Sequence, residues 1–329
     1  MNYQRLGSTG VKISRLALGG GNFGGVGSAP AFYGMGETES EAAELLDRAY
    51  DAGINLLDTA DAYGGGRSEQ FLGNWLKAKG SAVRDQLVLA SKVYNPVGPG
   101  PNQRGLSRLH VLRQIDTSLI RLGTDRLDLY LIHEPDPETP LEETLRALDD
   151  AVHAGKILYI GASNIEAWRI AVARGLSDLH RLARFAWVQN AYSLLDRTAE
   201  RDMLPFCADQ RVGFTAFSPL AGGWLTGKYR SAQYPPGSRM TLRPEPYLHL
   251  ATDRVFHGIE ALATAARARG VTIDALALAW VLHHPQVDAA ILGPRRPAHL
   301  DSAVTALEIV LSASEAAELA ALFLPPRSD

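Results

Sequence analysis

Four side chains that could together protonate an oxygen atom each follow a short apolar run of the sequence. Asp58 and Tyr63 follow one run, Lys92 ends a second, and His133 ends a third. A phenol is a weak acid, with a free pKa of about 10, and a nearby cation lowers that pKa. We therefore expect Lys92 to make Tyr63 a better proton donor, in a site that protonates an oxygen.

Strand-like and helix-like patterns alternate along most of the chain. Short apolar runs predict strands at residues 16–18, 54–58, 87–91, 127–132, 157–161, 186–189, 213–217 and 288–292. Helical spacing of apolar residues predicts helices at residues 38–53, 67–79, 107–122, 140–154, 165–173, 199–210, 255–269 and 297–308. This alternation indicates a parallel sheet covered by helices. Eight such units predict a closed (β/α)₈ TIM barrel, with the four side chains at the carboxyl ends of its strands.

Segments outside the repeat extend the predicted barrel. A β-hairpin is expected at residues 3–14 and an extra C-terminal helix at 312–323, giving one domain over residues 1–329. Long βα loops at 20–37, 94–106 and 218–252 all follow strands. They therefore lie on the face where barrels carry active sites, and we expect them to wall a pocket.

Composition excludes several classes of protein. The 329 residues carry a net charge of −3 and 46% hydrophobic residues, with no basic patch that would indicate nucleic acid or anionic lipid. No apolar run is long enough to span a bilayer, and the N-terminal residues lack the apolar stretch of a signal peptide. The single cysteine, Cys207, cannot form an internal disulfide. We expect a cytoplasmic protein of unspecified oligomeric state that acts on a small molecule.

Two glycine-rich motifs resemble nucleotide-binding loops. Residues 19–24 fit G-x-G-x-x-G, but no helix can begin inside the following Gly-Ser-Pro segment, which excludes a Rossmann site. Residues 222–228 fit G-x-x-x-x-G-K, but Tyr229 stands where a P-loop needs Ser or Thr. Phosphate binding by backbone N–H groups and Lys228 stays open.

Polar and flat groups at other strand ends suit a nicotinamide. Ser163 and Asn164 end one predicted strand, Gln189 ends the next, and Phe217 the one after. Helix capping would also explain Ser163 and Asn164, and core packing would explain Phe217. Taken together, they offer hydrogen bonds to an amide and a face for ring stacking.

Two further features allow competing interpretations. Arg295 and Arg296 begin the last barrel helix, where they suit the 2′-phosphate of an adenosine ribose better than simple solvation. Asp58, Lys92 and His133, with Glu134, could be read as a metal site, but a lysine would repel a divalent ion. A purely structural Asp58–Lys92 ion pair is the other alternative, although burying such a pair rarely stabilises a fold.

The joint pattern of these motifs resembles the aldo-keto reductase superfamily. The resemblance covers almost the whole chain, in family order, at residues 57–64, 91–92, 128–133, 161–164, 189–194 and 218–223. Residues 189–194 and 222–228 are most similar to bacterial reductases related to potassium-channel β-subunits. The resemblance implies NADPH-dependent reduction of an aldehyde or ketone. It makes Tyr63 the general acid, with Lys92 lowering its pKa, Asp58 holding Lys92, and His133 orienting the carbonyl.

The same resemblance implies a set of cofactor-binding residues. They are Gly21, Asn22, Phe23, Asp58, Ser163, Asn164, Gln189, Phe217, Ser218, Leu220, Gly222, Lys228, Gly293, Arg295, Arg296 and His299. His299 and Ala303 depart from the family pattern, which commonly has longer amide or charged groups beside the adenine.

The substrate pocket is expected to involve Phe23, Tyr94, His133 and Trp224, with parts of residues 230–250. These residues suggest an apolar or aromatic carbonyl compound, and a sugar aldehyde stays open. Two other functions remain: an NADP-binding regulatory subunit whose reductase activity is slow or incidental, and a metal-dependent barrel lyase or hydrolase.

Overall fold

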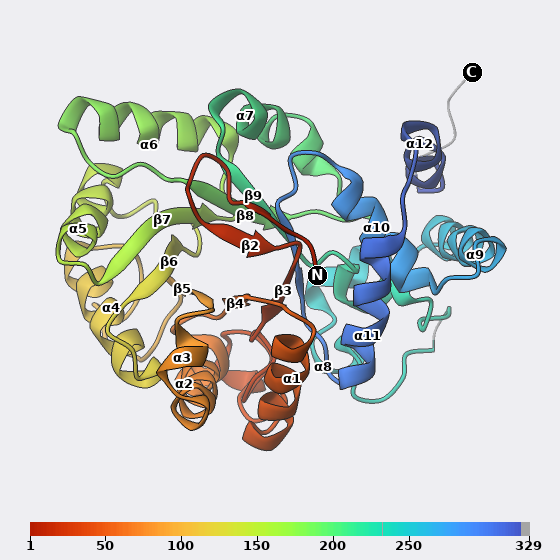
Figure 1. The fold of residues 1–329 in the computed structure, drawn as a ribbon, viewed down its shortest axis with the longest axis horizontal. Helices are drawn as coiled ribbons and strands as arrows, with labels where there is room; N and C mark the ends of the chain where they lie inside the picture. Colours follow the sequence, from red (N-terminus) through yellow and green to blue (C-terminus); the bar gives the residue numbers. More distant parts are fainter. Residues whose placement is uncertain (232, 324–329) are drawn as a thin grey trace.

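The predicted eight-stranded parallel barrel is confirmed in a computed structural model, which describes residues 1–231 and 233–323 (Figure 1). Its strands are β3 (Leu16–Gly19), β4 (Leu56–Asp58), β5 (Val88–Val93), β6 (Leu127–Ile132), β7 (Ile157–Ser163), β8 (Trp187–Ala191), β9 (Gly213–Phe217) and β10 (Ala289–Leu292). They follow one another around the barrel, and β10 closes it by pairing with both β3 and β9. Residue 232 and the last six residues of the predicted domain, 324–329, lie outside the described residues.

Helices surround the barrel and bury its outer face. They are α1 (Glu39–Asp51), α2 (Arg67–Lys79), α3 (Ser81–Arg84), α4 (Arg108–Leu122), α5 (Leu141–His153), α6 (Ala167–His180), α7 (Met203–Gln210), α8 (Arg239–Leu242), α9 (Asp253–Ala268), α10 (Ile273–His283), α11 (Pro297–Thr305) and α12 (Ala313–Ala321). Capping boxes begin α1 at Thr38 and α12 at Ser312. None of the helices in the described part of the chain is long and apolar enough to cross a membrane.

The hydrophobic core has two layers. Side chains such as Leu56, Leu129 and Trp187 fill the barrel interior. Alternate residues of the same strands, such as Leu57 and Tyr130, pack outward against the helices. Because side chains alternate along a strand, a residue at a strand's carboxyl end faces either the barrel interior or the helices.

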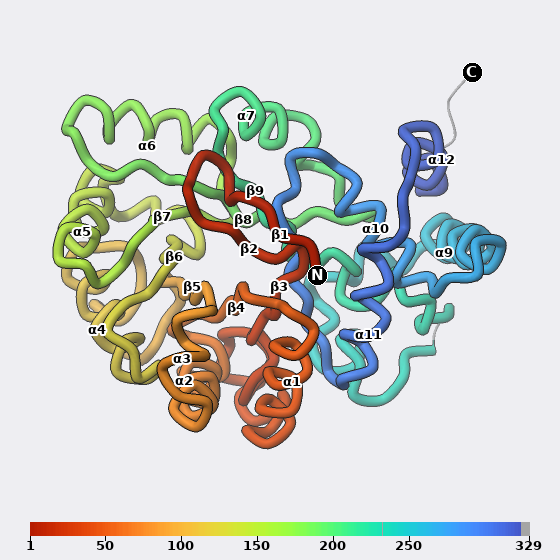
Figure 2. The backbone as a smooth tube through the Cα atoms, in the orientation of Figure 1, coloured from red at the N-terminus to blue at the C-terminus, as the bar shows by residue number. Residues whose placement is uncertain are grey.

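The N-terminal hairpin, β1 (Tyr3–Arg5) and β2 (Lys12–Ser14), lies across the end of the barrel where the strands begin (Figure 2). Leu6 is fully buried there, and Gly7 N donates a hydrogen bond to Asp288 Oδ2 at 3.1 Å. Since this closes the amino-terminal end, the other end of the barrel, called here the mouth, is left for a ligand.

One barrel helix differs from the prediction. The predicted helix at 255–269 is present as α9, but α10 follows it, precedes β10 and was not predicted. Residues 275–281 of α10 are all buried, between β10 and the neighbouring helices. A helix that is apolar on all sides shows no amphipathic period, which explains why the pattern was missed. Helix α9 is therefore an addition on the barrel's outer side.

The loop predicted at 218–252 contains short helical turns. These are η4 (Ala221–Thr226), α8 and η5 (Glu245–Leu250), and the first loop also contains η1 (Pro30–Phe32). Arg239 of α8 donates a hydrogen bond to Asn22 Oδ1 at 2.8 Å. The loops after the first and seventh barrel strands therefore meet beside the mouth.

Candidate active site

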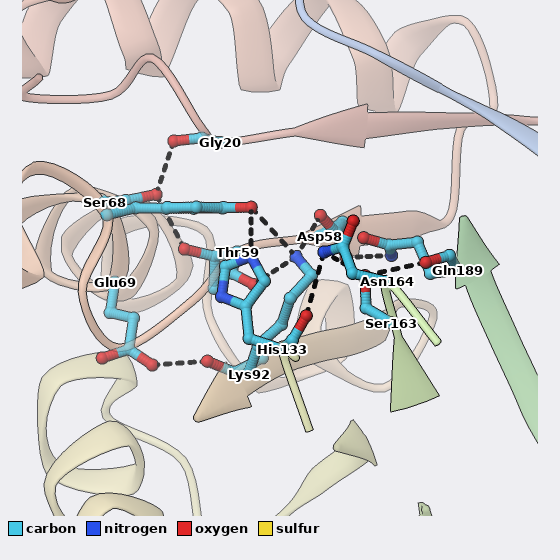
Figure 3. Close-up of polar contacts among 12 residues, drawn as sticks. Gly20, Asp58, Thr59, Ser68, Glu69, Lys92, His133, Ser163, Asn164 and Gln189 are labelled. Carbon is cyan, nitrogen blue, oxygen red and sulfur yellow. Dashed lines mark hydrogen bonds and ion pairs between the residues drawn. The ribbon is translucent and has the colours of Figure 1, made fainter. Parts of the chain in front are cut away.

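The structure brings the four predicted catalytic side chains together at the mouth, and Figure 3 labels three of them, Asp58, Lys92 and His133. Lys92 Nζ donates hydrogen bonds to Asp58 Oδ2 at 2.6 Å and to the backbone oxygen of Thr59 at 2.9 Å. The same ammonium lies 3.5 Å from Tyr63 Oη, and Tyr63 Oη lies 3.3 Å from His133 Nε2. An acid, an ammonium, a phenol and an imidazole thus form one continuous polar chain.

The strand register explains why Asp58 and Lys92 meet. Asp58 pairs with Ala90 across β4 and β5, so Lys92 stands two residues nearer the mouth on the same inward face. Because Lys92 and Asp58 are only 0% and 4% exposed, water does not screen their interaction.

The turn that carries Tyr63 is anchored to the backbone of β5. Thr59 N donates to Ala90 O at 2.9 Å, and Asp61 N donates to Lys92 O at 3.1 Å. Tyr63 then begins the short helical turn η2 (Tyr63–Gly66). Gly64 has φ of +58°, and a Cβ there would lie 2.5 Å from the backbone oxygen of Phe23, so a glycine is required. This close approach holds the phenol over Lys92.

Asp58 is held on both of its carboxylate oxygens. Gln189 Nε2 donates to Asp58 Oδ1 at 2.8 Å, while Lys92 occupies Oδ2. Burial alone would lower the pKa of Lys92, but Asp58 and Tyr63 raise it above its usual value. Lys92 therefore keeps its charge in a site from which water is excluded.

Lys92 lowers the pKa of Tyr63, as expected from the sequence, but a larger opposing effect leaves this pKa above its usual value. Burial raises the pKa of the phenol, and it outweighs the opposing effect of Lys92. Asp58 contributes in the same direction as burial, since it offsets the lysine charge. Tyr63 therefore holds its proton at neutral pH, which is the state that a proton donor requires.

His133 is a neutral, fixed ring. Burial, followed by the charge of Lys92, holds the pKa of its imidazole well below the usual value. Its backbone N donates to Val93 O at 2.9 Å, and its backbone oxygen accepts from Asn164 Nδ2 at 3.0 Å. Nδ1 of the ring lies 3.0 Å from Nδ2 of Asn95, a residue that the sequence did not single out.

A second polar group lies behind the turn from β4 to α2. Ser68 Oγ donates to Gly20 O at 2.8 Å and lies 2.7 Å from Thr59 Oγ1 (Figure 3). Ser91 Oγ donates to Glu69 Oε1 at 2.6 Å. These bonds join the first loop, β5 and α2. They therefore support the position of Tyr63 from outside the barrel.

The residues predicted to clamp a nicotinamide also reach the mouth. Ser163 Oγ donates to the backbone oxygen of Gln189 at 2.7 Å and lies 3.3 Å from Asn164 Nδ2. Among the described residues, neither Oδ1 of Asn164 nor Oε1 of Gln189 accepts a hydrogen bond, so both acceptors remain available. Phe217 packs part-buried on the apolar barrel interior.

Cationic side chains gather on the side of the mouth formed by η4, α8 and α11. Partial burial and then the charges of Arg295, Arg239 and Arg296 lower the pKa of Lys228. Arg239 was not predicted, because its separation along the chain from the other cations gave no local motif. Lys228, Arg239, Arg295 and Arg296 are called here the cation group. They place four positive charges where an anion could bind.

Other predicted cofactor residues adjoin the cation group. His299 Nδ1 accepts from the backbone N of Arg295 at 3.2 Å, and a Cβ on Gly293 would lie 3.7 Å from Asn22 Nδ2. Burial and then Lys228 and Arg296 lower the pKa of His299, which keeps its ring neutral.

The turn after β9 has an unusual backbone. Ser218 and Gly222 both have positive φ, of +50° and +63°, and Ser218 Oγ lies 3.1 Å from Tyr247 Oη. Leu220 is part-buried within this turn. A left-handed serine is strained, and such strain is often found where backbone groups are aimed at a ligand.

The predicted substrate residues are not equally placed. A Cβ on Gly21 would lie 3.8 Å from the ring of Tyr63, so the first loop borders the phenol. Tyr94 is half-buried beside the core, whereas Phe23 is only 2% exposed. Trp224 is fully buried, with its ring centroid 5.2 Å from that of Tyr229. In this structure Trp224 therefore offers no surface to a substrate, since its ring packs inside an aromatic cluster.

Metal ligands do not gather near these groups. Within residues 1–231 and 233–323, no three His, Cys, Asp or Glu side chains lie together in a way that could hold a metal ion. Asp58 is instead occupied by Lys92 and Gln189.

Comparison with known proteins relates this arrangement to a family. The model of the Aldo/keto reductase family matches residues 15–323. An uncharacterized oxidoreductase of Bacillus subtilis is 37% identical over 319 residues, which cover 94% of this chain and 92% of that protein. Versiconal hemiacetal acetate reductase of Aspergillus parasiticus is 33% identical, with 99% of this chain and 98% of that protein covered. A probable voltage-gated potassium channel subunit beta of Arabidopsis thaliana is 34% identical, with 94% and 92% covered.

The match includes all the barrel strands, β3 to β10, and the four side chains at the mouth, whereas the hairpin strands β1 and β2 lie before it. The resemblance seen in the sequence is therefore confirmed. This chain belongs to the aldo/keto reductase family and is an oxidoreductase of a family that uses nicotinamide cofactors.

Proposed function

We propose that this protein is an NADPH-dependent reductase that converts an aldehyde or ketone to an alcohol, with Tyr63 as the proton donor. The observation that most supports the proposal is the buried Lys92 ammonium, paired with Asp58 at 2.6 Å and 3.5 Å from Tyr63 Oη. A buried ion pair seldom stabilises a fold by itself, so its position beside a protonated phenol favours a chemical role.

When bound, reduced nicotinamide supplies a hydride to the carbonyl carbon. The protein's own contribution is to hold the carbonyl oxygen and to deliver a proton to it from Tyr63 Oη. Lys92 then donates a hydrogen bond to the phenolate that remains, and Asp58 keeps Lys92 in place. His133 Nε2 is the second group beside the oxygen. Donors fixed in advance in a water-poor site commonly supply a large share of a rate enhancement.

The residues at the mouth fit such a cofactor. The open amide oxygens of Asn164 and Gln189 can accept hydrogen bonds from a carboxamide, and Phe217 offers an apolar face. Gly21 and Asn22 border one side, with Ser218, Leu220 and Gly222 on the other, while Phe23 is only 2% exposed and packs beneath the first loop. The cation group, together with Gly293 and His299, suits phosphate.

A 2′-phosphate is best accommodated by Arg296. Arg295 Nε already donates to Glu37 Oε1 at 2.6 Å, and Glu37 is only 3% exposed. Arg296 is exposed at the N-terminus of α11, and it forms no ion pair among the described residues. An arginine beside a helix N-terminus binds phosphate favourably.

The test is a screen of NADPH oxidation with aldehydes, ketones and quinones, with NADH run in parallel. We expect turnover of at least one class with NADPH. Arg296→Ala should raise the KM for NADPH by about 10–100-fold, the effect of losing one charged hydrogen bond. The KM for NADH should change little. Arg254→Ala, an exposed arginine of α9, is the matched control. Equal use of NADH and NADPH by the unaltered protein would contradict the phosphate assignment.

A second candidate is an NADP-binding regulatory subunit with slow or incidental reductase activity. It is favoured by the 34% identity to a probable potassium channel subunit beta. The two functions differ in turnover: the regulatory candidate requires tight NADPH binding with negligible turnover over the whole panel.

A further inference from the structure

The ring of His133 is held on both of its nitrogen atoms. Nδ1 lies 3.0 Å from Asn95 Nδ2 and Nε2 lies 3.3 Å from Tyr63 Oη. The rings of His133 and Tyr63 meet edge to face, with centroids 5.4 Å apart and planes at 78°. Asn164 and Val93 fix the backbone of the same residue. The ring therefore has one orientation, and only the position of its proton is left to be decided.

A neutral imidazole carries one proton, on either Nδ1 or Nε2. The amide nitrogen of Asn95 is a donor only, so Nδ1, which it faces, must accept. We propose that Asn95 is a positioning residue, which fixes the proton of His133 on Nε2, facing Tyr63. The catalytic consequence rests on the function proposed above, whereas the proton position itself does not.

The proton on Nε2 decides where the proton of Tyr63 points. The phenol oxygen can accept two hydrogen bonds and donate one. With Lys92 Nζ at 3.5 Å and His133 Nε2–H at 3.3 Å as donors, both acceptor positions are filled. The O–H of Tyr63 is then free to point into the mouth. With the proton on Nδ1 instead, Nε2 would accept this O–H and turn it away from a substrate.

Asn95 is suited to this role because it carries no charge. The titratable groups that face the His133 ring are Tyr63 of η2 and Lys92 of β5, with Asp58 of β4 behind Lys92. A carboxylate in place of the amide would accept from Nδ1–H and would also favour the imidazolium. Asparagine specifies the tautomer and leaves the ring neutral.

The decisive experiment measures the ring nitrogens directly by 15N NMR of protein labelled at histidine. The chain has nine histidines, and the His133 signals are identified by their loss in His133→Gln. We expect an unprotonated Nδ1 and a protonated Nε2 in the unaltered protein, without substrate or cofactor. Asn95→Asp should exchange these assignments. A protonated Nδ1 in the unaltered protein, or unchanged signals in Asn95→Asp, would overturn the proposal.

Activity provides the second readout. Asn95→Asp should lower kcat by about 10–100-fold, the effect known for residues that orient metal-binding histidines. Its KM for NADPH should not change, and the acid limb of its pH profile should move to higher pH. Asn95→Ala, which removes the amide without adding charge, should lower kcat with no such pH shift. An Asn95→Asp enzyme with normal kcat and an unmoved pH profile would contradict the catalytic role.

Gln103→Ala is the matched control for both readouts. Gln103 is an exposed residue of the same loop, where its Oε1 accepts from Gly100 N at 2.9 Å, and it does not contact His133. We expect this variant to keep the ring signals and kcat. If the unaltered protein reduced no carbonyl compound, the proposed function would fail, while the NMR result would still decide the role of Asn95.

Discussion

At the scale of single residues, the site depends on one ammonium group that contacts three oxygen atoms. Lys92 Nζ contacts Asp58 Oδ2, the backbone oxygen of Thr59 and Tyr63 Oη. The first two contacts compensate the charge and fix the position of the amine. The third contact lowers the pKa of the phenol. The same side chain therefore pairs with Asp58 and acts electrostatically on Tyr63.

Removal of the phenol oxygen should separate proton donation from binding. Tyr63→Phe should lower kcat by at least about 10²–10⁴-fold, the usual contribution of a general acid. NADPH affinity, measured by fluorescence titration, should stay nearly constant. Tyr50→Phe is the control, since it removes an exposed hydroxyl whose hydrogen-bond partner among the described residues is Gln86. Unchanged turnover in Tyr63→Phe would refute the assignment of the acid.

Replacement of the ammonium should affect stability as well as activity. Lys92→Met leaves the buried Asp58 carboxylate without its cation, and breaking a buried pair in this way costs about 3–5 kcal/mol. Adding Asp58→Asn removes the stranded charge, so the double variant should regain part of the free energy of unfolding but not the activity. Urea denaturation and NADPH-oxidation assays on both variants measure this. A double variant no more stable than Lys92→Met would show that the ion pair does not explain the loss.

At the scale of elements, the sequence could predict which side chains meet at the mouth, because parallel strands bring their carboxyl ends to one edge of the sheet. Asp58, Lys92 and His133 each follow an apolar run, and this pattern depends on burial alone. The departures have physical causes. Helix α10 lacks an amphipathic period because it is buried on all sides. Asn95 lies on a loop and Arg239 on the short helix α8 within another long connection, and the path of both segments depends on tertiary contacts that no local pattern records.

The pKa values of the site could not be predicted from the sequence either. The chain order shows that Lys92 and Tyr63 lie near one another, but the pKa of Tyr63 depends on how deeply the phenol is buried. Likewise, the sequence predicts Trp224 as a pocket residue, and only the structure shows that it packs against Tyr229. The sequence could predict which residues lie near the mouth, but it could not predict how exposed their side chains are.

The turn between β4 and α2 predicts a pH-dependent stability. Asp61 is fully buried near Glu69 of α2, and burial, followed by the charge of Glu69, raises the pKa of Asp61 well above its usual value. As pH rises above about 4, the unfolded chain releases this proton first, so the carboxyl's contribution to the free energy of unfolding falls. The fall ends once pH exceeds the folded-state pKa.

Asp61→Asn should remove this dependence, because an amide has no proton to release. The stability of the variant relative to the unaltered protein should therefore increase as pH rises from about 4 toward 8. Urea denaturation across this range measures the difference, with the exposed Asp51→Asn as control. A difference that is constant with pH would mean that Asp61 is ionised in the folded state.

At the scale of the whole molecule, the barrel is closed by strands from opposite ends of the chain. β10 pairs with β3 through Leu292 and Leu18 and with β9 through Ala290 and Ala216. The proposed cofactor site has the same property, since Asn22 lies on the first loop and Arg296 on the last. Neither half of the chain can complete the barrel or the site without the other.

This closure predicts one cooperative thermal transition that NADPH shifts as a unit. A ligand at about 100 times its Kd stabilises the folded state by about 2.7 kcal/mol, so NADPH should raise Tm by a few degrees. NADH at the same concentration should raise it less, because it lacks the 2′-phosphate proposed to contact Arg296. In Arg296→Ala the two cofactors should give nearly equal shifts, whereas Arg254→Ala should behave as the unaltered protein. Calorimetry that resolved two transitions, only one of them moved by NADPH, would instead mean that the chain forms two domains and that the site lies in one of them.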